Sequence, residues 1–298
     1  MPDTKTEAVS KQSQENAKPT PVSKPKGILA TAAKADEVGR EGYRINALMV
    51  GPSGGGKTQS ALSHPGRKLL IDYDGRWEVA VGLPDVDIIK LHDPDPDSPK
   101  GWLQAEKLKK ELWFAARAAH KDKEPFAYDL IIEAGLTSML KYCMNWSLTL
   151  NPKTGLGGAP AMHHYGPQMH NVEQHVRSMK QLPCSYILEA HVEYLEVEEL
   201  DDILFTPKAT GKMRTAIPGW FNECYRCWSD KKKDGKVHYY WDTSGTGKWD
   251  FLKSTLNNLG KYWTDPIEID FSKPGPVGFA KLLDLRFGKE EKDETTER

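Results

Sequence analysis

The sequence predicts an α/β fold with a mainly parallel sheet and a late antiparallel hairpin. From residue 45 to residue 190, short apolar runs alternate with longer amphipathic stretches. This is the order of strands and crossover helices in a parallel sheet. Near the end of the chain, two segments of alternating apolar and polar residues flank the turn KKKDG. Such a pattern is typical of a hairpin, which adds antiparallel strands to the sheet.

The elements follow from the spacing of the apolar residues. Strands are expected at 45–50, 68–74, 87–91, 128–133 and 184–190, and the strands of the hairpin at 222–229 and 236–242. Helices are expected at 101–120, 137–148 and about 167–181. A glycine-rich loop separates the second and third of these helices, at 151–166.

Length and composition indicate one large domain with a tail at each end. The 298 residues are 38% hydrophobic and 28% charged, with a formal net charge of −1. We expect a disordered tail at 1–27, a domain at 28–288 and a charged tail at 289–298, because the tails hold too little apolar surface to offset the entropy of ordering. With so small a net charge, contact with a polyanion needs a local basic patch.

Neither a membrane-spanning segment nor a disulfide scaffold is expected. No apolar run approaches the roughly 18 residues that span a bilayer, so no membrane partner is predicted. Four cysteines in so long a chain do not form a disulfide scaffold, and a reducing compartment, the cytoplasm, fits them better. These are Cys143, Cys184, Cys224 and Cys227.

A phosphate-binding loop follows the first strand. The segment GPSGGGKT matches the pattern G-x-x-x-x-G-K-[ST]. Its glycines let backbone N–H groups point at phosphate oxygens, Lys57 reaches the β- and γ-phosphates, and the Thr58 hydroxyl ligates Mg²⁺. An apolar strand before the loop and a helix-compatible segment after it favour ATP binding over a flexible glycine turn. The predicted nucleotide-binding residues are Gly51, Pro52, Ser53, Gly54, Gly55, Gly56, Lys57, Thr58 and Gln59.

A phosphate loop also needs carboxylates for the metal and the attacking water. Asp72 and Asp74 follow the apolar run KLLI, and Glu133 ends the strand at 128–133. Asp129 starts that strand, which is the wrong end for a site at the carboxyl edge of a sheet. Asp72 and Glu133 are the metal candidates, although Glu133 also fits a solvated strand end. Asp74 is the candidate for activating water, or else the N-cap of the segment that follows it.

Several segments together resemble the short RecA-like ATPases of bacteriophages, a group of nucleotide-binding proteins that includes single-strand annealing proteins and recombinases. The matching segments cover about residues 44–270 and run in the same order. They are GPSGGGKT, PGRKLLIDYDG, FAYDLIIEAGLTSM, LPCSYILEAHVE and TGKMRTAIPGWFNECYRCW. The resemblance implies a RecA-like P-loop NTPase core.

The resemblance also implies roles for particular residues. It maps the carboxylate that orients water onto Asp74 and the residue that senses the γ-phosphate onto His191. With Lys57 and Glu133, these form the expected catalytic set. The loops after 133 and 190 correspond to DNA-facing loops, and Lys253 corresponds to a lysine that reaches ATP on a neighbouring subunit. Where relatives show Asp-Ser, this chain has Glu133-Ala134-Gly135, which favours slow hydrolysis.

Nucleic-acid contacts are expected from basic residues near aromatic ones, the combination found in single-strand binders. The basic candidates are Lys208, Lys212, Arg214, Lys231, Lys232 and Lys233, and the aromatic ones are Tyr194, Trp220 and Phe221. The acidic segment 192–202 opposes the approach of phosphates. The lysines of the hairpin turn also fit an ordinary solvated turn.

Two further patterns suggest metal sites. His191 and Glu193 followed by Cys224 and Cys227 resemble the H-x-E and C-x-x-C pattern of zinc deaminases, but Glu223 stands where those enzymes have proline. In an alternating strand the two cysteines point to opposite faces, which favours buried thiols. Three histidines near the glycine-rich loop fit a metal site, polar loop contacts or contacts with nucleic acid: His163, His164 and His170.

The leading hypothesis is an ATPase with ATP and Mg²⁺ that acts on single-stranded DNA in phage recombination or replication. Such a mechanism implies a homo-oligomer, and a single-strand-binding protein is a further candidate partner. The alternative is a nucleotide-gated binding module with little hydrolysis that serves a replication partner. A small-molecule kinase is the third hypothesis, although no lid with clustered arginines is visible.

Overall fold

The computed structural model describes residues 39–91, 99–150, 159–197, 202–233, 235–272 and 276–288. The tails expected at 1–27 and 289–298 lie outside these residues. From Gly42 onward, the described residues belong to one compact unit. None of the described helices is long and apolar enough to cross a membrane.

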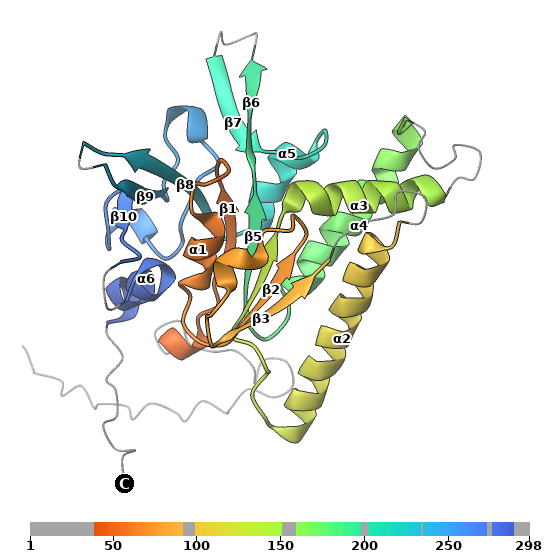
Figure 1. Ribbon diagram of the computed structural model, residues 1–298, viewed down its shortest axis with the longest axis horizontal. Coiled ribbons are helices and arrows are strands. Elements are labelled where there is room, and N and C mark those ends of the chain that lie inside the picture. Colours follow the sequence, from red (N-terminus) through yellow and green to blue (C-terminus); the bar gives the residue numbers. More distant parts are fainter. Residues whose placement is uncertain are drawn as a thin grey trace, which may run out of the picture. The chain divides into compact units, whose positions relative to one another are not determined.

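The centre of the fold is an eight-stranded sheet (Figure 1). Its order is β10-β9-β8-β1-β5-β4-β2-β3, and every pairing from β8 to β3 is parallel. The pairings of β8 with β9 and of β9 with β10 are antiparallel, which confirms the mainly parallel sheet with its hairpin extension. The strands are β1 Asn46–Val50, β2 Lys68–Asp72, β3 Val86–Lys90, β4 Leu130–Ala134, β5 Ser185–Ala190, β8 Glu223–Lys231, β9 Val237–Asp242 and β10 Ile267–Ile269.

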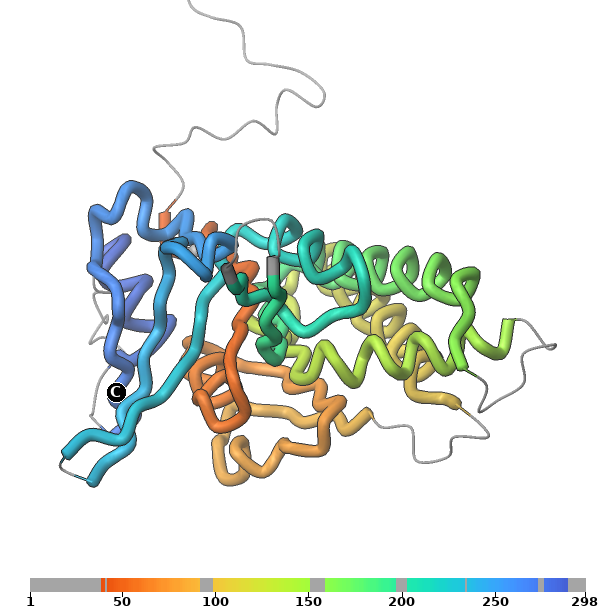
Figure 2. The backbone as a smooth tube through the Cα atoms, turned by 90° about the horizontal axis from the view of Figure 1, so that it is seen from above, coloured from red at the N-terminus to blue at the C-terminus, as the bar shows by residue number. Residues whose placement is uncertain are grey.

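Helices cover both faces of this sheet. The helices are α1 Lys57–Leu62, α2 Gly101–Asp122, α3 Leu136–Thr149, α4 Met162–Met179, α5 Met213–Ala216 and α6 Gly278–Phe287. Helices α2, α3 and α4 contact one another over one face, and α1 contacts α6 over the other. In Figure 2 the late segments β8, β9 and α6, cyan to blue, lie on one side of the early segment that carries β1, and α2–α4 lie on the other.

The two helical layers fix which way each strand residue points. Ile71 and Leu188 belong to the core under α2, α3 and α4, whereas Leu70 and Ile187 belong to the core under α1 and α6. Successive strand residues face opposite sides of a sheet. Two neighbouring residues at the end of a strand therefore contact different helical layers.

Besides β10 and α6, which were not expected, α4 and a second hairpin differ from the sequence-based expectation. Helix α4 begins at Met162, five residues before the expected start. Its first turns are held by buried polar contacts to α3: Ser147 donates to the carbonyl of His164 (2.7 Å), and Gln168 donates to the carbonyl of Leu140 (2.7 Å). A second hairpin was not expected at all, because its sequence is strongly acidic. It pairs β6 Val192–Val197 with β7 Asp202–Pro207 as a separate two-stranded sheet.

Candidate nucleotide-binding site

The phosphate loop runs from the end of β1 to the start of α1, as expected. Gly54 and Gly56 both have positive φ (78° and 79°), which side-chain-bearing residues rarely adopt. A Cβ atom on Gly51 would overlap the carbonyl oxygen of Cys227 on β8, and one on Gly55 would lie 2.8 Å from it. Glycine is needed in this loop because the loop curls tightly and also packs on the backbone of β8.

Lys57 and Thr58 follow the loop at the start of α1. The Lys57 ammonium donates to the carbonyl oxygens of Gly51 (3.0 Å) and Pro52 (2.8 Å), so it lies folded back over the loop. Burial lowers the pKa of Lys57, and the charge of Glu189 opposes that shift. The Thr58 hydroxyl donates to Oε2 of Glu189 at 2.7 Å. The start of α1 is thus tied to a carboxylate on β5.

Asp72, Ala134 and Glu189 lie in one row across three adjacent strands. The register pairs Asp72 of β2 with Ala134 of β4, and Ala134 with Glu189 of β5. Both carboxylates are almost fully buried, with exposures of 2% for Asp72 and 3% for Glu189. Burial raises the pKa of Glu189 to about 7 and also raises the pKa of Asp72. Oδ2 of Asp72 and Oε1 of Glu189 have no hydrogen-bond partner in the described part of the chain.

The structure brings Asp74 and His191 together. His191 Nε2 lies 3.6 Å from Asp74 Oδ2. Burial raises the pKa of Asp74, but hydrogen bonds from His191 and Ser138 outweigh it and leave the pKa below its usual value. Gly135 makes room for this carboxylate, because its φ is +109° and a Cβ atom there would lie 2.6 Å from Asp74 Cγ.

The alternative role of Asp74 as a helix N-cap is wrong. The 3-10 turn that follows spans Trp77–Ala80, its N-cap residue is Arg76, and it receives no side-chain capping hydrogen bond. Asp74 instead lines a cleft with the phosphate loop and the ends of β2, β4 and β5. Within the described residues, no group of three or more His, Cys, Asp and Glu side chains is placed to hold a metal. A cation in this cleft therefore needs the Thr58 hydroxyl and phosphate oxygens among its ligands.

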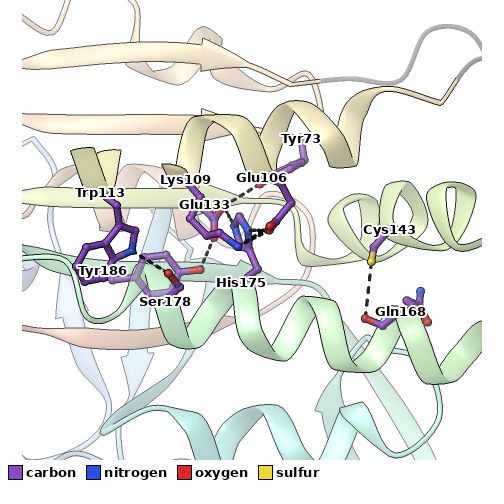
Figure 3. Close-up of polar contacts among 10 residues, drawn as sticks. All are labelled: Tyr73, Glu106, Lys109, Trp113, Glu133, Cys143, Gln168, His175, Ser178 and Tyr186. Atoms are coloured by element: carbon purple, nitrogen blue, oxygen red, sulfur yellow. Dashed lines mark hydrogen bonds and ion pairs between the residues drawn. The ribbon is translucent and has the colours of Figure 1, made fainter. Parts of the chain in front are cut away.

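The expectation that Glu133 serves the metal is wrong (Figure 3). Glu133 is fully buried and faces α2 and α4, on the other side of the sheet from the phosphate loop. Its Oε1 accepts hydrogen bonds from Tyr73 and His175 (both 2.8 Å), and its Oε2 accepts one from Tyr186. His175 in turn contacts Glu106 of α2 at 2.8 Å. Glu133 is the centre of a buried polar network, and neither a solvated strand end nor a metal ligand.

Comparison with known proteins places this chain in a family. A family model described as an AAA domain matches residues 44–251. The chain belongs to this AAA domain family. No curated protein matches it.

Membership makes the chain a P-loop NTPase-type domain that binds nucleotide, which agrees with the geometry of the phosphate loop. The matched residues include every side chain of the cleft described above. They end before Lys253, whose exposed side chain does not line that cleft. The Lys253 backbone pairs with Cys224 of β8, level with Leu48 of β1.

The basic residues expected to meet nucleic acid fall on two different parts of the AAA domain. Lys208 and Arg214 line a second cleft beside α3, with Lys212 exposed between them. The hairpin lysines, Lys231, Lys232 and Lys233, lie at the far end of β8 and its turn. Of these, Lys232 lies 3.8 Å from Glu268 and 5.3 Å from the centre of the Tyr240 ring.

The cysteines and histidines do not form the zinc arrangement. Cys224 and Cys227 are buried free thiols in the two different cores of the AAA domain, on opposite faces of β8 as expected. They cannot ligate one ion together. His164 accepts a hydrogen bond from the backbone N–H of Ala161 at 2.9 Å, at the start of α4. Part of the glycine-rich loop, 151–158, lies outside the described residues.

Three charged or aromatic side chains of the cleft were missed from the sequence. They are Glu189, Arg76 and Tyr239, and all three line it. Arg76 donates to the Ser53 hydroxyl at 2.7 Å, and the ring of Tyr239 on β9 packs so closely on Gly56 that a Cβ there would lie 2.7 Å from it. Glu189 did carry a signal: it is the one charged residue of β5, whose sequence is SYILEA.

Proposed function

We propose that this chain is an ATPase that acts on DNA, binding single strands for annealing or recombination in a bacteriophage. The observation that carries the proposal is a second cleft, one of whose lining residues, Lys208, is hydrogen-bonded to His191 of the nucleotide cleft. It is lined by α3, the start of α4, the beginning of β6 and the segment 208–214. A nucleotide cleft alone supports only nucleotide binding, whereas two linked clefts support an activity in which ATP controls a second ligand.

The second cleft has the chemistry that suits a single strand of nucleic acid. Lys141, Lys208 and Arg214 give it positive charge, and Tyr165 gives it an aromatic ring. Proteins that bind single strands combine a basic groove for the backbone with aromatic faces for the bases. Glu193 lies in the same cleft, 3.6 Å from Arg214, so the ion pair offsets the acidic character of β6 at this point.

The backbone links the two clefts directly. The carbonyl of His191, which lines the nucleotide cleft, accepts a hydrogen bond from the Lys208 N–H at 2.7 Å. The Thr137 hydroxyl donates to the Lys208 carbonyl at 3.4 Å, only two residues after Gly135. A displacement of His191 or Gly135 on nucleotide binding would move the basic segment at 208–214.

Each side chain of the nucleotide cleft has a separate role in hydrolysis. Lys57 and the loop N–H groups hold the phosphates and neutralise charge that develops on them. Asp74, ionised and held by His191, orients the attacking water by accepting a hydrogen bond from it. His191 lies beside that water, where it senses the γ-phosphate. The nucleotide brings a divalent cation that would neutralise phosphate charge, and Thr58 and Asp72 fit it, since both offer oxygen atoms to the cleft.

Partners follow from the same proposal. ATPases of this kind act as oligomers, so we expect a homo-oligomer on DNA in which Lys253 reaches the nucleotide of a neighbouring subunit. A single-strand-binding protein in the cytoplasm of the host cell is a further expected partner. The hairpin lysines 231–233 are an additional expected contact for DNA.

The test is binding of a fluorescent single-stranded oligonucleotide to the full chain at low salt, with and without a non-hydrolysable ATP analogue and Mg²⁺. We expect the analogue to tighten binding. Lys208→Ala should weaken it and reduce the slope of log affinity against log salt by about 0.7, the value for one lost phosphate contact on a single strand. Lys121→Ala, an exposed lysine near the end of α2, is the matched control. Binding that does not respond to the analogue would refute the proposal.

A nucleotide-gated binding module with little hydrolysis is the second candidate. The observation that favours it is Ala134, which leaves the end of β4 without a carboxylate on the face of the phosphate loop. Measured turnover separates the two candidates. Negligible release of phosphate both with and without DNA, together with tight ATP binding, would favour the module, whereas turnover stimulated by DNA would favour the ATPase.

A further inference from the structure

We propose that Glu189 of β5, together with Asp72 of β2 and Thr58 of α1, holds the divalent cation of the bound nucleotide, in place of a carboxylate on β4. The inference rests on the proposed nucleotide-binding function and names residues for it. Glu189, which was not assigned to the site from the sequence, thereby takes the role of metal ligand that was predicted for Glu133.

The strand β4 cannot supply the carboxylate. Its residue on the face of the phosphate loop is Ala134, whose side chain is a methyl group. The neighbouring Glu133 points to the opposite face, where hydrogen bonds from two tyrosines and a histidine occupy its oxygens. To reach the phosphate loop, Glu133 would have to pass through the sheet.

Glu189 occupies the position that a metal ligand needs. It lies next to Ala134 in register, on the strand between β4 and β1. Its Oε2 accepts a hydrogen bond from the Thr58 hydroxyl, the group that ligates the cation in phosphate-loop proteins. Ligand oxygens of one cation must lie close together, and these two atoms are 2.7 Å apart.

The other oxygen of Glu189 points to a ligand that the protein itself does not supply. Glu189 is 97% buried, since its exposure is 3%, and Oε1 has no hydrogen-bond partner in the described part of the chain. A buried carboxylate oxygen left without a partner is costly, so it is retained where a ligand compensates for it. Oδ2 of Asp72 is buried in the same way and lines the same cleft.

The two carboxylates stand on either side of Ala134. Adjacent strands are about 4.8 Å apart, so the backbones of Asp72 and Glu189 are separated by about 10 Å. The small side chain of Ala134 between them leaves room for a cation and its waters. Mg²⁺ commonly keeps several waters and takes only one or two carboxylates plus phosphate oxygens, and this row of residues fits that requirement.

A merely structural role is the rival explanation. In that case, Glu189 only anchors Thr58 and offsets the charge of Lys57. The two explanations differ in one measurable respect: a metal ligand changes how strongly Mg²⁺ promotes nucleotide binding, whereas an anchor changes nucleotide binding equally with and without Mg²⁺.

The first measurement is the affinity of the full chain for a fluorescent ATP analogue in Mg²⁺ and in EDTA. The second is its affinity for Mn²⁺ in the presence of a non-hydrolysable analogue, measured by electron paramagnetic resonance. Wild type should bind the analogue more tightly in Mg²⁺. Glu189→Gln should lose about 10- to 100-fold in Mn²⁺ affinity and most of the Mg²⁺ dependence, whereas its affinity in EDTA should change far less. Glu78→Gln, an exposed acid on the turn after β2, is the matched control and should behave as wild type.

A second variant, Asp72→Asn, keeps the inference testable if Glu189→Gln folds poorly, because it removes the other proposed carboxylate ligand and leaves Glu189 in place; it should also lower the affinity for Mn²⁺. Ala134→Asp combined with Glu189→Gln moves the carboxylate to β4, one strand away, and should restore part of the lost Mn²⁺ affinity. Full Mg²⁺ dependence and Mn²⁺ affinity in Glu189→Gln would overturn the inference and leave nucleotide binding intact. Failure of wild type to bind the analogue in either buffer would instead refute the proposed function itself.

Discussion

Replacing Glu133 by glutamine tests whether this residue stabilises the fold or serves the nucleotide site. Glu133 accepts hydrogen bonds from Tyr73, Tyr186 and His175 in a fully buried pocket. A carboxylate only accepts hydrogen bonds, but a glutamine amide offers one acceptor and one donor group. In Glu133→Gln the NH₂ group would face a donor, and the buried imidazolium of His175 would lose one of the two carboxylates that contact it at 2.8 Å.

The expected cost can be worked out from the structure. The charges of Glu133 and Glu106 outweigh burial and raise the pKa of His175 from 6.5 to about 9. Since a tenfold change in proton affinity corresponds to about 1.4 kcal/mol, the network contributes about 3 kcal/mol to folding while His175 is protonated in both states. Removing one partner of a buried ion pair typically costs about 3 to 5 kcal/mol. The value derived from the pKa of His175 and the typical cost of breaking a buried ion pair therefore agree on a loss of about 3 kcal/mol in the free energy of unfolding.

The pH dependence follows from the direction of the shift. A histidine whose pKa is raised by folding stabilises the fold fully below its unfolded pKa of 6.5, and this contribution is lost as pH rises through about 9. The wild-type free energy of unfolding should therefore fall between these pH values. In Glu133→Gln it should be lower by about 3 kcal/mol at pH 6, with a weaker fall toward pH 9.

The assay is chemical denaturation from pH 6 to pH 9, together with the affinity for a fluorescent ATP analogue measured well below the unfolding transition. Glu111→Gln is the control, because Glu111 lies on the exposed side of α2 and its removal should change stability by less than about 0.5 kcal/mol. Nucleotide affinity should be unchanged in both variants. Unchanged stability with lost, Mg²⁺-dependent nucleotide binding in Glu133→Gln would refute this account and return Glu133 to the metal site.

Three further variants address the cleft. Lys57→Ala should weaken ATP binding about 10- to 100-fold, the equivalent of a charge-assisted hydrogen bond, with an unchanged unfolding midpoint; an unchanged affinity would contradict its role. Gly135→Ala should cost about 1 to 2 kcal/mol in stability for the left-handed backbone and should also lower phosphate release, because the new methyl group displaces Asp74. Tyr239→Ala should weaken ATP binding by about tenfold, because the ring of Tyr239 lines the cleft and offers the base a face for stacking. Titration with ATP and with inorganic triphosphate checks this prediction: only the affinity for ATP should fall.

The sequence predicted the strands well because each is a short apolar run with a sharp boundary. The central strands are buried on both faces, so their composition is nearly continuous and does not reveal which residue faces which layer. Glu133 was assigned to the phosphate loop for this reason. A shift of one residue along β4 exchanges the two faces, and it is Ala134 that shares a row with Asp72.

Other features depend on contacts between distant segments, which a single sequence does not display. Glu189 meets Thr58 across 131 positions of the chain. Tyr239 reaches Gly56 because the hairpin of β8 and β9 packs beside the phosphate loop. The hairpin of β6 and β7 was missed because its acidic residues resemble a solvated loop. Asp74 and His191, in contrast, were both assigned to the nucleotide site, and their side chains lie 3.6 Å apart because each follows a parallel strand whose carboxyl end lies at the same edge of the sheet.

The most direct test of the account is an experimental structure of the full chain with a non-hydrolysable ATP analogue and Mg²⁺. We predict that the β- and γ-phosphates lie in the loop at Gly51–Thr58 against Lys57. Asp74 and His191 should lie beside the γ-phosphate, with the cation on Thr58, Asp72 and Glu189. An analogue bound outside this loop would contradict the central claim.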